Sequence, residues 1–259
     1  MIHLNRRQRH WIDFLIAMTE KEIKARYKFA WLGFLWIILN PLLQMLIVGS
    51  IFQFLIKVPT NHYFLYLFAG LLLWNFFSFT VVKNTPMILN ERSLIKKAFF
   101  PRESIILSVV LSNAFHLIIG MLLFLFVCVI RIGPTVLFRL HIAILALLLL
   151  FMLTIGCSLL FSALNVRYRD VNFFVQALMP LWFYATPIVY SAKNMPSSLQ
   201  SLLYINPLTG PTEMLQHTFS GGELSSFLRF IPGVLITFII FILGWWKFQK
   251  DAPDFEDWA

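Results

Sequence analysis

Residues 90–103 read NERSLIKKAFFPRE, and this charged stretch lies between two long runs that contain no charged residue. Four of its residues are basic and two are acidic. Its apolar side is formed by Leu94, Ile95, Phe99 and Phe100. Pro101 ends any helix here, because proline lacks a backbone N–H and disfavours helical geometry at the preceding residue. The stretch fits an ordinary loop held inside the cell by its positive charge, and it fits equally a short amphipathic helix that docks a soluble partner.

Outward from this stretch, the chain divides into long windows without Asp, Glu, Lys or Arg. These windows are residues 29–56, 58–82, 104–130, 140–166, 171–192 and the slightly shorter 230–246. About 20 apolar residues are needed for a helix to cross the ~30 Å hydrocarbon core of a bilayer. The pattern therefore predicts an all-α integral membrane protein with six transmembrane helices in a single transmembrane domain over residues 1–259.

Composition agrees with this class of protein. Of the 259 residues, 59% are hydrophobic and only 13% are charged, which is about half the charged share of an ordinary soluble domain. The net charge of +9 does not require a nucleic-acid partner, and we expect none, because basic residues also gather on the cytoplasmic side of membrane proteins. Cys128 and Cys157 both lie inside apolar runs and indicate neither a disulfide nor a metal site.

The distribution of Lys and Arg predicts the orientation. With six spans, both termini lie on one side, together with residues 83–103, 167–169 and 247–250. That side holds 16 Lys and Arg residues, and the other side holds 5. The positive-inside rule therefore places both termini in the cytoplasm.

Two segments outside the spans have patterns of their own. Residues 8–28 have helical periodicity with an apolar and a basic face, which is typical of a helix that lies in the membrane interface, although such a helix can also pack on the protein itself. Residues 194–220 carry no charge before Glu213 but contain Pro196, Asn206, Pro207 and further helix breakers. We interpret this segment as one or two short helices that dip into the outer side of the membrane and return, with an ordinary surface loop as the alternative.

Several kinds of chemistry are missing from the sequence. It contains no P-loop motif, so the chain does not bind its own nucleotide through that element, and no clustered metal-ligand spacing occurs. No charged residue lies near the middle of a predicted span, which disfavours an ion-coupled carrier. A membrane glycosyltransferase or ligase acting on lipid-linked sugars remains an alternative, but Glu213 and Glu223 would be the only carboxylates that it could use on the outer side.

Aromatic residues make up 17% of the chain. Aromatic rings offer flat apolar faces on which sugar rings can slide without tight hydrogen bonding. Most of these rings fit equally well as packing residues or lipid-facing residues. Our candidates for the wall of a passage are Trp36, Trp74, Phe77, Tyr184 and Tyr190.

Three groups of short motifs resemble the membrane (permease) subunit of polysaccharide-exporting type-two ABC transporters, the exporters of O-antigen, capsule and teichoic acid. The first group is RYK at 26–28, LGFLW at 32–36 and NPL at 40–42. The second is WN at 74–75 followed by Asn90, Leu94, Ile95, Lys97 and FPRE at 100–103. The third is ALNVRYRDV at 163–171, TPIVY at 186–190 and NPLT at 206–209. They cover most of residues 20–215 in the order of that family.

The resemblance implies a homodimer in the bacterial cytoplasmic (inner) membrane, paired with two copies of a separate ATPase that binds ATP and Mg²⁺. The chain itself would hold no cofactor and catalyse no reaction, and its cargo would be a lipid-linked polysaccharide, with a smaller drug or lipid as the alternative. The coupling helix would fall at residues 88–100, gate helices in 194–220 and an interface helix in 1–28. We predict that ATPase movement is transmitted through Glu91, Arg92, Lys96, Lys97, Arg102, Arg167, Tyr168, Arg169 and Asp170.

Overall fold

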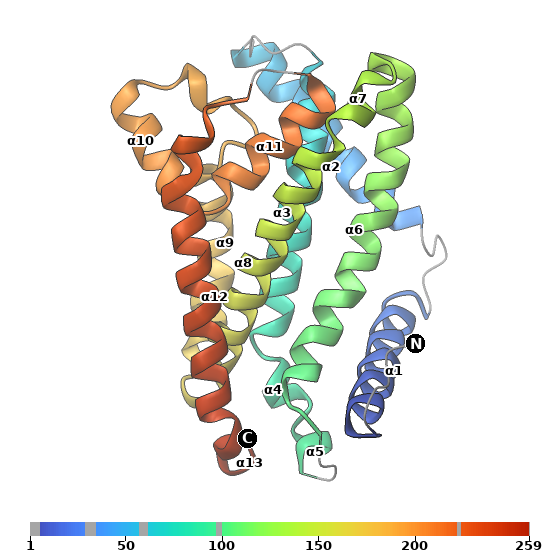
Figure 1. Cartoon of the computed structure of the whole chain (residues 1–259), viewed down its shortest axis with the longest axis vertical. Coiled ribbons are helices and arrows are strands. Elements are labelled where there is room, and N and C mark those ends of the chain that lie inside the picture. Colours follow the sequence, from blue (N-terminus) through green and yellow to red (C-terminus); the bar gives the residue numbers. More distant parts are fainter. Residues whose placement is uncertain (1–5, 29–34, 57–61, 97–99, 222–223, 259) are drawn as a thin grey trace.

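The computed structural model describes residues 6–28, 35–56, 62–96, 100–221 and 224–258, and every regular element in these ranges is helical (Figure 1). The α-helices in chain order are α1 (Arg6–Tyr27), α2 (Trp36–Ile56), α3 (Tyr63–Asn84), α4 (Met87–Asn90), α5 (Arg92–Ile95), α6 (Glu103–Ile132), α7 (Thr135–Phe138), α8 (Leu140–Arg167), α9 (Asp170–Ala185), α10 (Ser197–Ile205), α11 (Thr209–Ser220), α12 (Ile231–Asp251) and α13 (Phe255–Trp258). Short 3-10 turns cover Ala192–Asn194, Phe227–Phe230 and Ala252–Asp254.

Four helices in the described part of the chain, α3, α6, α8 and α12 with its flanking turns, are long and apolar enough to cross a membrane. They match four of the predicted windows. Within α2, a shorter apolar stretch covers Ile38–Gln53. The window 171–192 is helical only as far as Ala185, because Thr186 is extended and precedes Pro187, which disfavours helix at that position.

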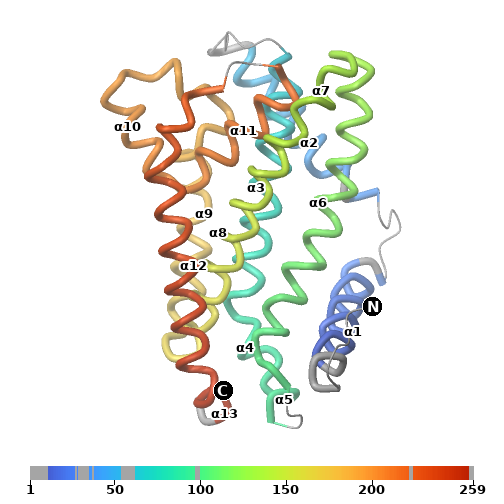
Figure 2. Tube along the Cα trace, in the orientation of Figure 1, coloured from blue at the N-terminus to red at the C-terminus, as the bar shows by residue number. Residues whose placement is uncertain are grey.

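Helix α3 lies at the centre of the bundle, and its side chains are buried along most of its length. It contacts α2, α6, α8, α9 and α11. Figure 2 shows α3 surrounded by neighbouring helices of the bundle. Beside it, α8 and α12 cross at Gly156 and Gly244, where an added Cβ on either glycine would collide with the opposing backbone. These two glycines let the helix pair approach more closely than any side chain would allow.

A second hydrophobic cluster closes the end of the bundle that carries the C-terminus. It joins α4 and α5 to the adjoining parts of α6, α8, α12 and α13. Its fully buried members include Ile88, Ile105, Phe248 and Phe255. Figure 1 places α4, α5 and α13 together at this end and α7, α10 and α11 at the other.

Helix α1 confirms the helix predicted over residues 8–28 and packs alongside α6. Met18 is buried and the ring of Phe14 stacks on Phe100 at 4.4 Å between centroids. Ile16 remains 59% exposed. The apolar face of α1 is therefore divided between contact with the protein and open surface that lipid can cover.

Candidate functional site

The predicted helix over residues 88–100 is not continuous. It is replaced by two single turns, α4 and α5, with Glu91 between them at φ −97° and ψ 20°, outside the helical region. The side chain of Glu91 reaches Lys21 on α1 at 2.7 Å instead of following a helix surface. Residues 97–99 lie outside the described residues. The expected docking element is thus a compact loop with two helical turns.

Two of the predicted coupling residues are held by ion pairs within the protein. Glu91 is paired with Lys21, and only 18% of its side chain is exposed. Arg102 donates to Glu256 at 2.5 Å, and only 17% of its side chain is exposed. These pairs fix the loop to α1 on one side and to the C-terminal segment on the other. Both residues therefore position the loop and offer little charge to a partner.

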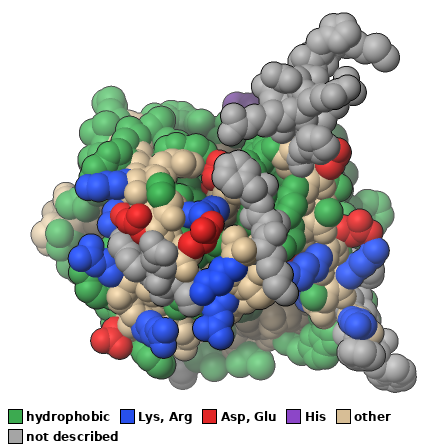
Figure 3. Space-filling view, turned by 90° about the horizontal axis from the view of Figure 1, so that it is seen from below, with side chains coloured by type: hydrophobic (Ala, Val, Ile, Leu, Met, Phe, Trp, Pro, Cys, Tyr) green, Lys and Arg blue, Asp and Glu red, His purple; other side chains and the backbone are tan. Residues whose placement is uncertain are grey.

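The remaining cations of the loop lie at the surface. Arg92 and Lys96 are exposed and have no ion-pair partner among the described residues. Lys97 lies outside the described residues. Figure 3 shows this end of the molecule directly, with Lys and Arg side chains gathered on it and fewer acidic ones between them. The surface is suited to an acidic partner, because charge complementarity steers and orients association.

The turn between α8 and α9 lies at the same end as the loop, because α4 packs against α8 near its last residues. Its four residues, Arg167, Tyr168, Arg169 and Asp170, are all exposed. The guanidinium of Arg167 lies 5.5 Å from the ring centroid of Tyr168. Asp170 begins α9, where its negative charge is favourable toward the helix N-terminus. The structure thus brings the two predicted cytoplasmic contacts to one face.

The C-terminal segment is a part of this face that sequence reasoning missed. Phe255 is fully buried and lies edge-on to Phe248 at 5.2 Å between centroids. The next residue, Glu256, holds Arg102. The sequence signal for this docking was the presence of two aromatic residues, Phe255 and Trp258, in a tail with four acidic residues.

The aromatic candidates for a passage wall fall into two groups. Phe77 is fully buried and Trp74 is 8% exposed. Both rings pack edge-on against α9, Trp74 on Phe183 and Phe77 on Trp182, so these two side chains belong to the core and face no open space. Trp36 and Tyr184 are 46% and 64% exposed. The partly buried Tyr190 donates its hydroxyl to the carbonyl of Tyr184 at 3.0 Å.

Residues 194–220 contain the two short helices α10 and α11, joined by a turn at Asn206 and Pro207. The Asn206 amide is fully used in holding this turn to the end of α9. Its oxygen accepts from the indole N–H of Trp182 at 2.9 Å and from the backbone N–H of Leu208 at 3.1 Å. Its nitrogen donates to the carbonyl of Ala185 and to Oγ1 of Thr186. Pro196 precedes α10, and its carbonyl accepts the first backbone hydrogen bonds of that helix.

Residues 186–190 form turns and bends between α9 and α10 and are held by side chains of two other helices. Tyr63 and Tyr66 on α3 donate to the carbonyls of Val189 and Tyr190, at 3.0 and 2.9 Å. Gln216 on α11 donates to the carbonyl of Ile188 at 3.1 Å. Irregular backbone at membrane depth is tolerated only when protein or a water-filled cavity satisfies it, and here three buried side chains do so.

Glu213, one of the two outer carboxylates that a glycosyltransferase could use, is occupied in the same region. It accepts from the hydroxyl of Tyr204 at 3.0 Å and from the backbone N–H of Ser225 at 2.9 Å. Burial raises the pKa of Tyr204, and the nearby Glu213 carboxylate adds to the rise. The tyrosine therefore remains a donor at neutral pH, and the carboxylate acts as an anchor for the chain. Glu223 lies outside the described residues.

Comparison with known proteins assigns the chain to a family over most of its length. The ABC-2 type transporter family matches residues 14–220, which include most of α1, the α4–α5 loop, the α8–α9 turn and both short helices. The chain belongs to this family of transporter membrane proteins. It is a permease subunit and not an enzyme, and the family implies pairing with a nucleotide-binding ATPase subunit.

Individual relatives are similar in sequence over most of the chain. The chain is 34% identical to the O-antigen export system permease protein RfbA of Klebsiella pneumoniae, over 92% of each chain. It is 32% identical to the protein of that name from Myxococcus xanthus, over 85% of each chain. The polysialic acid transport protein KpsM of Escherichia coli is 23% identical, over 88% of this chain and 89% of KpsM. The match thus extends beyond any one motif and covers nearly all of each protein.

Proposed function

We propose that this chain exports lipid-linked polysaccharide of the O-antigen class across the bacterial cytoplasmic (inner) membrane. The observation that carries the proposal is the 34% identity to an O-antigen export permease over 92% of both chains. The lower identity to KpsM, 23%, favours O-antigen over a capsular polymer. The cargo makes this a step in lipopolysaccharide biosynthesis, and the teichoic-acid alternative has no support from the named relatives.

In this proposal each subunit crosses the membrane six times, through α2, α3, α6, α8, α9 and α12. The charged end in Figure 3 faces the cytoplasm, with both termini. Support comes from the sorting of basic residues toward that end. The outer short helices α10 and α11 then act as gate helices, and α1 lies along the inner membrane face.

We further propose a homodimer that binds two copies of the ATPase, which hold ATP and Mg²⁺ and supply the energy. The α4–α5 loop is the coupling element, with Arg92 and Lys96 as its contact residues and Lys97 beside them in the sequence. Arg167, Arg169 and Asp170 form the second contact. Glu91 and Arg102 act by positioning the loop, as their internal ion pairs support. Of the aromatic candidates, Trp36, Tyr184 and Tyr190 remain for the passage wall.

Affinity purification of the chain in mild detergent, with mass spectrometry of what accompanies it, tests the assembly. A stoichiometric P-loop ATPase is the expected result. A chain that is pure and alone in several mild detergents would overturn the transporter assignment and favour the membrane enzyme.

The coupling residues have a separate test. The double variant Arg92→Ala/Lys97→Ala, and its counterpart Arg92→Ala/Lys96→Ala, should uncouple ATP hydrolysis from export and still insert normally. Lys250→Ala is the matched control, because it removes an exposed cation of α12 outside the contact surface. Export equal to wild type in both double variants would exclude a coupling role for this loop.

A further inference from the structure

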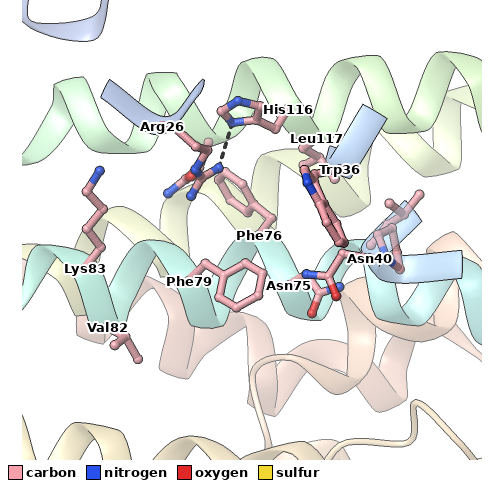
Figure 4. Close-up of a pocket in the computed structure, with 13 residues that line it drawn as sticks. Arg26, Trp36, Asn40, Asn75, Phe76, Phe79, Val82, Lys83, His116 and Leu117 are labelled. Carbon is pink, nitrogen blue, oxygen red and sulfur yellow. Dashed lines mark hydrogen bonds between the residues drawn. The ribbon is translucent and has the colours of Figure 1, made fainter. Parts of the chain in front are cut away.

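A cavity of about 580 Å³ lies between α1, α2, α3 and α6 (Figure 4), and of its lining residues only Trp36 has been given a role above. Its α3 wall extends from Leu72 to Lys83, which is ~16 Å along the helix at 1.5 Å per residue. The cavity is therefore long and narrow, and its length follows the helix that we place across the membrane.

The two ends of the cavity differ in charge. Arg26 and Lys83 lie at one end, and Trp36 and Asn40 lie at the other (Figure 4). Lys83 belongs to the last turn of α3, so the cationic end is the one nearer to the charged face of the molecule. Between the ends the wall is mainly apolar, and Phe76 contributes to it.

The charge at the cationic end is not balanced within the described residues. Lys83 is paired with Glu22, a carboxylate that is only 5% exposed. Arg26 instead contacts Nδ1 of His116 at 3.0 Å. A guanidinium has only donors, so this ring nitrogen must be the acceptor and carries no proton in the contact. No Asp or Glu in the described ranges forms an ion pair with Arg26. One positive charge therefore faces the cavity.

We propose that this cavity binds the phosphate group of a lipid, with the phosphate at Arg26 and the first part of the lipid chain along the apolar wall at Phe76 and Leu117. A guanidinium is the side chain that recognises phosphate oxygens best, because its parallel N–H groups match them in pairs. Arg26 is an exposed residue that lines the cavity, so its charge is available to an anionic group that enters there. The amphipathic wall suits a ligand with an anionic head and a hydrocarbon chain.

Two lipids share this chemistry. One is the diphosphate carrier of the polysaccharide, in which case the cavity is the cytoplasmic-side recognition site of the proposed substrate and the inference rests on the proposed function. The other is an anionic phospholipid of the membrane. Binding of either lipid requires Arg26. Competition between the two lipids for the cavity shows which one it prefers.

The test uses the permease in complex with its ATPase, in nanodiscs of phosphatidylcholine. Native mass spectrometry measures retention of two added probes, a C55 polyprenyl diphosphate and phosphatidylglycerol. Arg26→Gln should weaken retention of the bound lipid about ten- to a hundred-fold, as expected for loss of a hydrogen bond to a charged group. Arg26→Lys should show lipid retention between that of the wild type and that of Arg26→Gln. Lys24→Gln is the control, because Lys24 lies on the same helix, is exposed and pairs with Glu20.

The outcomes are distinct. Preference for the diphosphate over phosphatidylglycerol, lost in Arg26→Gln, assigns the site to the substrate carrier. Equal retention of the diphosphate and phosphatidylglycerol, with both lost in Arg26→Gln, assigns the cavity to membrane phospholipid. Wild-type retention in Arg26→Gln overturns the proposal. Should Arg26→Gln fail to fold, Val82→Phe narrows the cavity from α3 without altering either cation, and it should reduce retention in the same way.

Failure of this inference can be told apart from failure of the proposed function. Lipid retention is measured without transport, so a complex that exports polysaccharide but binds lipid independently of Arg26 removes only the cavity proposal. A chain that recruits no ATPase removes the proposed function, whatever Arg26 binds.

Discussion

The two ends of the molecule are built by different means. At the end that carries α10 and α11, the breaks between helices are held mainly by side-chain hydrogen bonds, including four made by the single amide of Asn206. At the charged end, single helical turns are held by ion pairs and a small hydrophobic cluster. The end with α10 and α11 uses these polar side chains for contacts within the protein. The charged end leaves Arg92, Lys96 and Arg169 exposed.

This difference follows from the surroundings of each end. In the proposed orientation the broken backbone at the end with α10 and α11 enters the membrane, where protein groups must replace water as hydrogen-bond partners. At the aqueous end, water satisfies what the protein does not, and exposed ion pairs contribute little stability. Cations without an internal ion pair at that end therefore reduce folding stability little, and they are available to bind a partner. The comparison predicts that substitutions of hydrogen-bonded polar side chains at the end with α10 and α11 change stability, whereas substitutions of the exposed cations at the charged end change coupling.

The largest effect is expected from Asn206→Leu. This change removes the acceptor of the Trp182 indole N–H and of the Leu208 backbone N–H, and both donors then lack their partner. We expect a loss of about 2–6 kcal/mol, because each of the two unsatisfied donors costs about 1–3 kcal/mol. The stability loss is measured as a lower midpoint of thermal denaturation in detergent, with the folded fraction at each temperature determined by size-exclusion chromatography.

Two companion variants sharpen this test. Asn206→Asp keeps the acceptor and loses the donors to Ala185 and Thr186, so its midpoint should lie between wild type and Asn206→Leu. Ser201→Ala on exposed α10 surface should match wild type, since its hydroxyl bonds only within its own helix. An unchanged midpoint for Asn206→Leu would show that the amide does not hold the turn.

Phe255→Ala should have the next largest effect, at the opposite end. The ring is fully buried against Phe248, and truncating a buried phenylalanine costs about 3–5 kcal/mol; we expect about 3 at this peripheral cluster. Hydrogen exchange should accelerate in α5 and the last turn of α12 and stay unchanged in α10 and α11. Equal acceleration at both ends would mean that the two regions are not independent.

A smaller effect is expected from Glu22→Gln, and the contrast with Glu91→Gln is the informative part. Glu22 is 5% exposed and paired with Lys83, while Glu91 pairs with the half-exposed Lys21. The half-exposed surface pair should contribute at most about 1 kcal/mol. Loss of the more buried pair should cost about 1–3 kcal/mol, below the full value for a buried pair because Lys83 is 39% exposed. Thermal denaturation curves of the two variants measure the two losses. A larger loss for Glu91→Gln than for Glu22→Gln would contradict the view that the more buried ion pair contributes more stability.

Sequence patterns predicted the elements of this fold better than their contacts. Uncharged windows located α3, α6, α8 and α12, because lipid excludes charge along a whole span. They could not show that Phe77 points inward and Tyr184 outward, since aromatic residues suit the core, the lipid and a passage alike. The partner of Arg102 lies 154 residues away in the sequence, and no local pattern indicates such a contact. The break at Glu91 also depends on a distant residue, Lys21.

The smallest expected effect on stability is also the one that separates positioning from binding at the charged end. Glu256→Gln leaves the glutamine able to accept from Arg102 but removes its charge, and Glu256 is half exposed, so we expect a loss of under about 1 kcal/mol. ATP hydrolysis by the complex should be nearly normal, whereas polysaccharide exported per ATP hydrolysed should fall, because the loop is no longer fixed to the C-terminal segment. Arg92→Gln should instead weaken ATPase binding itself. If Glu256→Gln weakens ATPase binding as much as Arg92→Gln does, the C-terminal segment is part of the contact surface, and the distinction drawn between the paired and exposed cations fails.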